Sequence, residues 1–326
     1  MPLQETASGL ADDIRFTAEE ELAAYRAMLL IRRFEEKAGQ LFALGTIHGS
    51  CHLSIGQEAV IVGATMAAEA DDPVVTGFRT HGHMLARGID ARRIMAELAG
   101  GQSGLSSGKG GSIHMFSRAH AFFGGHAILG APAPIGAGLA FASAYRGRRN
   151  VCLASFGDGA ASKGRVHETF KIASEWKLPI VFIIDNNTAA PGSGAVPSAL
   201  AERGVCFAIP GQQVDGIDVR RVRAAVRRAL DRARNGEGPT ILEMLTFRYR
   251  GHAAPPAAKP GTVDRPRAET DPVAKARTRI LEDGLASESR LRTIEKDVRE
   301  TVNEAAEFAR ADKAPDSSQL EAAGLP

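Results

Sequence analysis

Residues 151–187 read VCLASFGDGAASKGRVHETFKIASEWKLPIVFIIDNN, and this pattern predicts one βαβ unit. An apolar run at 151–156 ends at Gly157-Asp158-Gly159, and a second at 179–185 ends at Asn186-Asn187. Both runs have the length and composition of buried parallel strands, and the segment between them is compatible with a helix. A right-handed crossover brings the carboxyl ends of both strands to one edge of the sheet, where open α/β folds bind ligands. We therefore expect Asp158 and Asn187 to lie close together.

The residues at these two strand ends suit a metal ion that holds a diphosphate. Mg²⁺ prefers oxygen ligands in octahedral geometry and usually shares them with substrate phosphates. The Asp158 carboxylate, the Asn187 amide oxygen and a nearby backbone carbonyl would supply protein ligands. Gly157 and Gly159 allow a sharp turn, and a helix expected to begin near Gly164 would point amide groups at the negative charge. The alternative is a solvated Gly-Asp-Gly turn beside an unrelated Asn pair.

The spacing from Gly157-Asp158-Gly159 to Asn186-Asn187 resembles the signature of thiamine-diphosphate enzymes. The flanking sequence is similar to the alpha subunit of 2-oxo acid dehydrogenases, the decarboxylating component of the pyruvate, branched-chain 2-oxo acid and acetoin dehydrogenase complexes. The similarity is strong over residues 17–252 and looser beyond them. The supporting segments are HLSIGQEA at 52–59, FRTHGHMLARG at 78–88, GKGGSIHMF at 108–116, GGHAILGAPAPIGAGLA at 124–140, WKLPIVF at 176–182 and YRGH at 249–252.

This resemblance implies an α/β fold of the thiamine-diphosphate-binding type, in which helices cover both faces of a central, mostly parallel sheet. It also implies thiamine diphosphate and Mg²⁺ as cofactors. The metal ligands would be Asp158, Asn187 and the backbone carbonyl of Ala189. The residues expected to contact the cofactor are Phe78, Arg79, Ala127, Leu129, Gly157, Asp158, Gly159, Ala160, Asn187 and His252.

For four of these residues the resemblance suggests a functional role, whereas the residue types alone favour a structural explanation. Arg79 would contact the diphosphate, because a guanidinium fork suits phosphate oxygens, but it could also form a surface salt bridge. Ala127 and Leu129 would face the aminopyrimidine ring, although from their residue types alone both would be core. His252 would be the catalytic histidine, which can move protons near neutral pH, whereas a lone loop histidine is usually just exposed.

The implied activity is oxidative decarboxylation of a 2-oxo acid, with pyruvate preferred, or cleavage of acetoin, followed by transfer of the acyl group to a lipoyl carrier. The glutamate that activates the aminopyrimidine lies on the beta subunit in two-chain members of this family. We therefore expect an α₂β₂ heterotetramer that is inactive without its beta subunit. A lipoyl-bearing acyltransferase would be the further partner.

Two segments depart from the family pattern and leave other functions open. Residues 188–193 replace a run that commonly carries a tyrosine, and residues 253–261 replace the loop that carries regulatory phosphorylation in animal relatives. No hydroxyl follows His252, so we do not expect that form of control. Because these segments could affect substrate choice, a non-oxidative carboligase or decarboxylase subunit remains an alternative. A cofactor-binding assembly subunit without catalysis is another.

Composition and charge favour a soluble enzyme. The net charge of +2 arises from 40 basic and 38 acidic residues, which gives no reason to expect nucleic-acid binding. A cluster of arginines at 220–228 has the spacing of a solvated helix face. The three cysteines, Cys51, Cys152 and Cys206, suggest reduced thiols. We expect a cytoplasmic protein without a signal peptide, because the first residues lack a basic start and an apolar core and no apolar run could span a bilayer.

Two other motifs favour structural explanations. GAGLA at 136–140 lacks the last glycine of a dinucleotide-binding fingerprint and does not follow a strand, so Gly136 and Gly138 are expected to be packing positions. The histidines at 48, 52, 81 and 83 are too irregularly spaced to favour a transition-metal site, and no carboxylate supports them.

We expect a single domain over residues 17–311, an N-terminal extension at 1–16 and an extended tail at 312–326. A capping box of Thr17 and Glu20 would begin a long helix that ends near residue 44. The glycine-rich region 100–126 should be long, irregular and functional. Further helices are expected at 57–70, 91–98, 134–145 and 218–234 and within 271–311, and further strands at 74–76 and 239–245.

Overall fold

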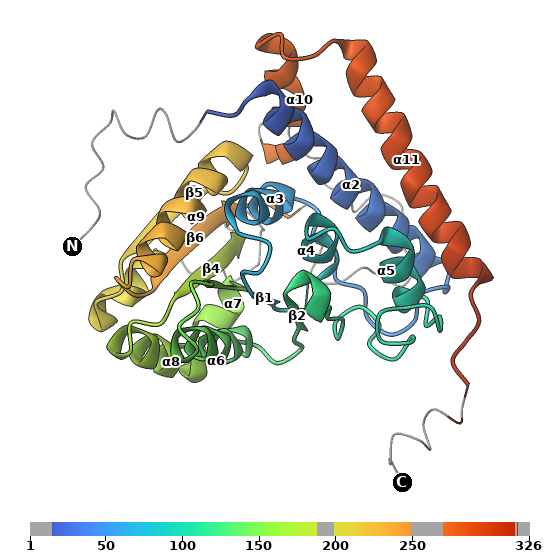
Figure 1. Cartoon of the computed structure of the whole chain (residues 1–326). Coiled ribbons are helices and arrows are strands. Elements are labelled where there is room, and N and C mark those ends of the chain that lie inside the picture. The colour runs from blue at the N-terminus through green and yellow to red at the C-terminus, as the bar shows by residue number, and fades with distance from the viewer. Residues whose placement is uncertain (1–14, 188–198, 249–269, 317, 319–326) are drawn as a thin grey trace.

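The computed structural model describes residues 15–187, 199–248, 270–316 and 318 of the 326-residue chain. Six strands form one sheet in the order β2-β1-β3-β4-β6-β5, and every pair of neighbouring strands in it is parallel. The expected α/β fold with a central parallel sheet is therefore confirmed (Figure 1). The strands are β1 Val74–Thr76, β2 Phe122–Gly125, β3 Cys152–Gly157, β4 Ile180–Asn187, β5 Gly211–Asp215 and β6 Thr240–Thr246.

The βαβ unit lies at the centre of this sheet, as predicted. β3 pairs with β4 along its whole length, and Gly157 at the end of β3 lies opposite Asp185 near the end of β4. The chain between them forms α7 (Asp158–Ala161) and α8 (Gly164–Glu175). α8 begins where the sequence predicted, whereas the short α7, which starts at Asp158 itself, was not anticipated.

Helices cover both faces of the sheet because successive side chains of its inner strands point to opposite sides. In β4, Val181 and Ile183 belong to one hydrophobic core and Ile180, Phe182 and Ile184 to the other. The second core includes residues of α6 (Pro132–Tyr145) and α8, which lie side by side at the lower left of Figure 1. The first core includes residues of α2 (Ala18–Ala43), α3 (Glu58–Ala67) and α9 (Val219–Arg234).

The long N-terminal helix α2 (Ala18–Ala43) begins at the predicted capping box. Thr17 accepts a hydrogen bond from the Glu20 backbone, and the Glu20 carboxylate accepts one from the Thr17 backbone. α10 (Pro272–Glu282) and α11 (Glu288–Ala311) return to pack on α2, and α11 also packs on α5 (Ala91–Leu98), as Figure 1 shows. The predicted helices at both ends of the chain are therefore confirmed.

Four details differ from the sequence-based expectations. The glycine-rich region ends in strand β2, which its FFGG sequence did not suggest, and the polar strand β5 was also missed. A short helix, α4 (His81–Ala86), follows Arg79. Gly136 packs tightly against Ala154 and Ile180 as predicted, but Gly138 is exposed, and a methyl group there would meet no atom within 4 Å. The expectation that Gly138 is a packing position is therefore wrong.

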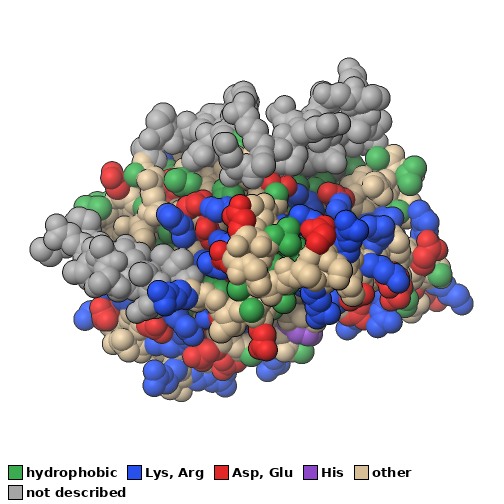
Figure 2. All heavy atoms as spheres, turned by 90° about the horizontal axis from the view of Figure 1, so that it is seen from above, with side chains coloured by type: hydrophobic (Ala, Val, Ile, Leu, Met, Phe, Trp, Pro, Cys, Tyr) green, Lys and Arg blue, Asp and Glu red, His purple; other side chains and the backbone are tan. Residues whose placement is uncertain are grey.

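The surface carries mixed charge. Figure 2 shows basic and acidic side chains interspersed over the part of this face that the described residues form. Within the arginine cluster on α9, Arg220 and Arg223 form ion pairs with Glu21 and Glu20 of α2, so part of the cluster fastens two helices together. Among the described residues, no helix is long and apolar enough to cross a membrane.

The cysteines are free thiols. Cys51 and Cys152 are buried, and burial raises the pKa of both thiols, whereas Cys206 is exposed. A raised pKa disfavours the reactive thiolate, so the two buried cysteines behave as core residues.

Candidate functional site

The two predicted metal ligands meet at the carboxyl edge of the sheet. Asp158 is the first residue after β3, and Asn187 is the last residue of β4. The backbone N–H of Asn187 donates a long hydrogen bond of 3.4 Å to Asp158 Oδ2. The crossover geometry therefore brings these two residues together, as their positions at neighbouring strand ends predicted.

The turn at Asp158 leaves space for a ligand beside it. Asp158 is half-buried, and its Oδ1 accepts a hydrogen bond of 2.6 Å from the Gly159 backbone. No atom lies within 4 Å of the point where a side chain would begin at Gly157 or Gly159, and Ala160 turns into the core. An anionic group could therefore approach the backbone closely at this turn.

Asn187 is held in place by the chain that follows the neighbouring strand β6. Its side chain is buried, and its amide oxygen accepts a hydrogen bond of 2.9 Å from the backbone of Arg248, just beyond the end of β6. A carbonyl-type oxygen has two lone pairs, so one remains for a metal ion. The donor set of carboxylate and amide oxygens at one edge fits Mg²⁺.

Arg79 lies on the loop between β1 and α4, close to the same edge. Its Nη1 donates a hydrogen bond of 2.9 Å to the Leu53 carbonyl, and its guanidinium lies 5.4 Å from the centre of the Phe78 ring. Burial and the nearby positive charge of Arg248 lower the pKa of Arg79 to about 10, against the opposing pull of three acidic side chains. Arg79 is thus a partly enclosed cation, which favours a ligand-binding role over a salt bridge at the open surface.

Two charged residues at this edge were missed by the sequence reasoning. Asp185 points to the same region, and burial raises the pKa of its carboxyl to about 7, although Ser155 donates a hydrogen bond of 3.2 Å to it. Its Oδ1 and the Nε of Arg248 are shielded from solvent and have no hydrogen-bond partner among the described residues. Their signal in the sequence was weak, because Asp185 could be read as part of a strand and Arg248 as one of many arginines.

Ala127 and Leu129 follow β2 and are exposed, with 42% of Leu129 accessible. The alternative reading of both as core residues is therefore wrong. Ala189 and His252 lie outside the described residues. The chain enters the segments that contain them at Asn187 and Arg248, which are hydrogen-bonded to each other.

A buried chain of hydrogen-bonded polar side chains begins two residues after Arg79, and it too was missed. His81 Nδ1 lies 2.9 Å from Glu35 Oε2, and His81 Nε2 lies 2.9 Å from the Ser112 hydroxyl. All three residues are buried. The chain connects α2, α4 and the glycine-rich region, and its residues are too far apart in the sequence for their spacing to have suggested it.

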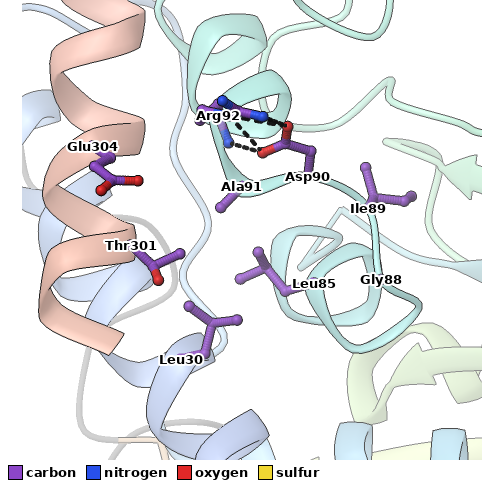
Figure 3. A pocket seen from close by; sticks show the side chains of 9 residues that line it. All are labelled: Leu30, Leu85, Gly88, Ile89, Asp90, Ala91, Arg92, Thr301 and Glu304. Carbon is purple, nitrogen blue, oxygen red and sulfur yellow. Dashed lines mark hydrogen bonds and ion pairs between the residues drawn. The ribbon is translucent and has the colours of Figure 1, made fainter. Parts of the chain in front are cut away.

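One cavity, of about 480 Å³, lies among α2, the α4–α5 connection, α5 and α11 (Figure 3). It has an apolar floor, and its rim carries the exposed ion pair between Asp90 and Arg92. None of the described candidate site residues lines it, so this cavity is separate from the candidate site.

The chain is similar to known proteins along most of its length. The family model described as "Dehydrogenase E1 component" matches residues 26–318. The pyruvate dehydrogenase E1 component subunit alpha of Rhizobium meliloti (strain 1021) is 52% identical over 312 residues, which cover 94% of this chain and 90% of that protein. The protein of the same name from Zymomonas mobilis is 48% identical over 310 residues, which cover 93% of this chain and 87% of that protein.

A plant relative is more distant but still matches along nearly the whole chain. The pyruvate dehydrogenase E1 component subunit alpha-3, chloroplastic, of Oryza sativa is 40% identical over 338 aligned residues, which cover 98% of this chain and 79% of that protein. Together with the family match over most of the sequence and the parallel sheet, these similarities mean that the chain belongs to the dehydrogenase E1 component family.

Proposed function

We propose that this chain is the alpha subunit of a thiamine-diphosphate-dependent pyruvate dehydrogenase, which decarboxylates pyruvate and passes the acyl group to a lipoyl carrier. The observation that carries the proposal is the meeting of Asp158 and Asn187 beside the open turn at Gly157 and Gly159. The names of the relatives, all pyruvate dehydrogenase alpha subunits, support pyruvate as the substrate.

The residues of this chain would hold the two ends of the cofactor. Asp158, Asn187 and the Ala189 carbonyl would hold Mg²⁺, and Arg79 would hold the diphosphate. Phe78 packs beside Arg79, while Ala127 and Leu129 face the aminopyrimidine ring. When bound, thiamine diphosphate supplies a nucleophilic carbon and accepts the electron pair left by decarboxylation. His252 holds or moves a proton at the reacting end.

Exposed apolar side chains in the same stretch of chain as Leu129 support the proposed beta subunit. Phe116, Phe123 and Ile128 are 60%, 38% and 61% exposed, and they come from the same glycine-rich region and β2–α6 loop as Leu129. Exposed apolar side chains concentrated in one segment are typical of a surface that another chain covers. In the α₂β₂ assembly the beta subunit encloses the aminopyrimidine end and contributes the activating glutamate.

Residues 17–311 act as one cytoplasmic domain, and the lipoyl-bearing acyltransferase docks onto this assembly.

The experiment that tests this function measures Mg²⁺-dependent binding of thiamine diphosphate to the complex of the full chain with its beta subunit, by calorimetry. Asp158→Ala removes a charged metal ligand, and we expect it to weaken binding at least 100-fold and to abolish pyruvate decarboxylation. Asp90→Ala serves as the matched control, because Asp90 pairs with Arg92 at the exposed rim of the separate cavity. Unchanged affinity in Asp158→Ala would refute the metal assignment.

A second measurement separates the reaction from its alternatives. The wild-type complex should reduce a lipoylated acyltransferase domain in the presence of pyruvate. Tight cofactor binding without turnover of pyruvate, branched 2-oxo acids or acetoin would instead indicate an assembly subunit. Decarboxylation or carboligation without acyl transfer to the lipoyl group would indicate a non-oxidative enzyme.

A further inference from the structure

Glu97, in the last turn of α5, has its carboxylate wrapped by the glycine-rich region. Its Oε2 accepts hydrogen bonds from the backbone N–H groups of Ser106 at 2.7 Å and Gly108 at 2.9 Å. Its Oε1 accepts from Gly110 at 2.6 Å and Gly111 at 3.2 Å. Glu97 is fully buried. Both oxygens of one carboxylate therefore organise four backbone amides within six residues of chain.

Four hydrogen bonds to one carboxylate stabilise the local backbone conformation strongly. A buried carboxylate is costly unless hydrogen bonds compensate for its lost hydration, and bonds to a charged acceptor are stronger than neutral ones. The glycines allow the chain to come this close. A methyl group at Gly104 would collide with Glu97 itself, one at Gly108 with the Gly100 carbonyl, and one at Gly110 with the His114 carbonyl. The glycine content of residues 104–111 thus reflects close packing around an internal anion.

The segment that Glu97 folds leads directly to the candidate site. Ser112, the next residue, is held by two neighbours of Arg79: the Thr80 hydroxyl donates to the Ser112 carbonyl at 2.8 Å, and the His81 imidazole contacts the Ser112 hydroxyl at 2.9 Å. The Ile113 carbonyl then packs against Gly125 so closely that a methyl group at Gly125 would collide with it. Gly125 ends β2, two residues before Ala127.

We propose that Glu97 is a positioning residue for the thiamine-diphosphate site. Its carboxylate folds residues 104–113 into a rigid block, and this block fixes the end of β2 and the loop that carries Ala127 and Leu129. The effect falls mainly on the aminopyrimidine end of the site, because the diphosphate end also has Asp158 and Asn187 on separate strands. This inference rests on the proposed function for its ligand, whereas the folding of the segment by Glu97 can be tested without it.

The test compares Glu97→Gln with the wild-type chain in its complex with the beta subunit. The substitution replaces one acceptor oxygen with an NH₂ donor that faces backbone N–H groups, so the segment should loosen. Lys109 lies inside the segment with an exposed side chain and reports on this loosening through trypsin cleavage after it. We expect cleavage after Lys109 at least tenfold faster than in the wild type. Glu304→Gln is the matched control, since Glu304 is an exposed glutamate at the rim of the cavity in Figure 3.

The affinities for two ligands then test whether the segment affects the site. We expect Glu97→Gln to raise the Kd of thiamine diphosphate with Mg²⁺ at least tenfold, and to change the Kd of inorganic diphosphate with Mg²⁺ less than threefold. A general loss of stability would lower the fraction of folded protein without separating the two ligands. If Glu97→Gln does not fold, Glu97→Asp takes its place, because it keeps the charge but shortens the reach and should show the same effects in smaller degree.

Each result of these measurements tests a different part of the proposal. Wild-type affinity for thiamine diphosphate would overturn the positioning role of Glu97, and wild-type rates of cleavage after Lys109 would overturn its role in folding the segment. Equal weakening of both ligands would overturn its link to the aminopyrimidine end. Failure of the wild-type complex to bind thiamine diphosphate would overturn the proposed function instead, and the cleavage assay would still judge whether Glu97 folds the segment.

Discussion

His83 carries a buried imidazole in α4, and burial lowers its pKa to about 4. In the unfolded chain the same group titrates near its usual pKa of about 6.5. Between these values the unfolded chain binds a proton that the folded protein does not, so the free energy of unfolding must fall as the pH falls from about 6.5 to 4. Above pH 6.5 both states are neutral, and the effect vanishes.

We predict that His83→Gln removes this part of the pH dependence. From pH 7.5 to pH 5, the wild-type chain should lose about 2 kcal/mol more unfolding free energy than the variant, because a shift of one pKa unit corresponds to about 1.4 kcal/mol. Urea unfolding of both chains at the two pH values measures the difference. His48→Gln, at an exposed position, is the control and should follow the wild type. Parallel pH profiles for His83→Gln and the wild type would contradict a neutral buried His83.

The sequence predicted the site residues that follow strand ends and missed those that depend on distant partners. Asp158 and Asn187 could be placed together because the geometry of a parallel βαβ unit is general. Glu97 could not be placed, because its partners are backbone amides in a region whose path has no regular period. Asp185 lies in β4 and Arg248 lies just beyond β6, and these two strands are neighbours only through the strand order of the whole sheet.

Among the helices and strands, the elements with a clear apolar period were predicted, whereas those that depend on distant partners were missed. α9 and α11 are strongly amphipathic, and their ends agree with the predicted ends to within one residue where the prediction gave one. β2 has only four residues, two of them glycine, and β5 is a mostly polar strand at the edge of the sheet. Neither offers the apolar alternation that indicates a strand, so tertiary pairing alone defines them.

Helix α6 offers a matched pair of glycines for a stability prediction. A methyl group at Gly136 would lie 2.9 Å from the Ala154 side chain and 3.1 Å from Ile180, whereas one at Gly138 would meet nothing within 4 Å. Alanine is favoured over glycine in a helix by about 1 kcal/mol. We therefore predict that Gly138→Ala raises the free energy of unfolding by up to about 1 kcal/mol.

Gly136→Ala should have the opposite sign, because overpacking a dense interface costs about 1 to 3 kcal/mol and outweighs the gain in helix propensity. Urea unfolding of the full chain alone gives both values under identical conditions. Equal effects of the two substitutions would mean that α6 can move away from β3 and β4 without cost, against the tight packing that the structure describes.

On the scale of the whole molecule, a buried ion cluster connects parts of the chain that are far apart in the sequence. Arg32 of α2 donates to Glu58 of α3 at 2.6 Å, and its two terminal nitrogens bind the Asp271 carboxylate at 3.1 Å each. Burial alone would lower the pKa of Arg32, but the two carboxylates outweigh it and raise that pKa. Asp271 also caps the first turn of α10. One guanidinium thus joins the N-terminal helix to the C-terminal pair.

The cluster also reaches the candidate site. Glu58 accepts a hydrogen bond of 2.9 Å from the Gly56 backbone, and Gly56 packs so closely on the Phe247 carbonyl that no side chain would fit there. Phe247 immediately precedes Arg248, whose backbone holds Asn187. Breaking the cluster should therefore lower the global stability and also disturb the metal ligands.

We predict that Arg32→Met lowers the free energy of unfolding by about 3 to 5 kcal/mol, since removing one partner of a buried ion cluster leaves the other charges uncompensated. Methionine keeps most of the apolar stem, so lost packing contributes little. Arg92→Met removes an exposed ion pair and should leave stability unchanged within error. Denaturant unfolding measures both. Because the cluster contacts the chain just before Arg248, Arg32→Met should also weaken Mg²⁺-dependent binding of thiamine diphosphate. A large loss of stability with wild-type affinity would show that the cluster supports the helices and leaves the sheet edge unaffected.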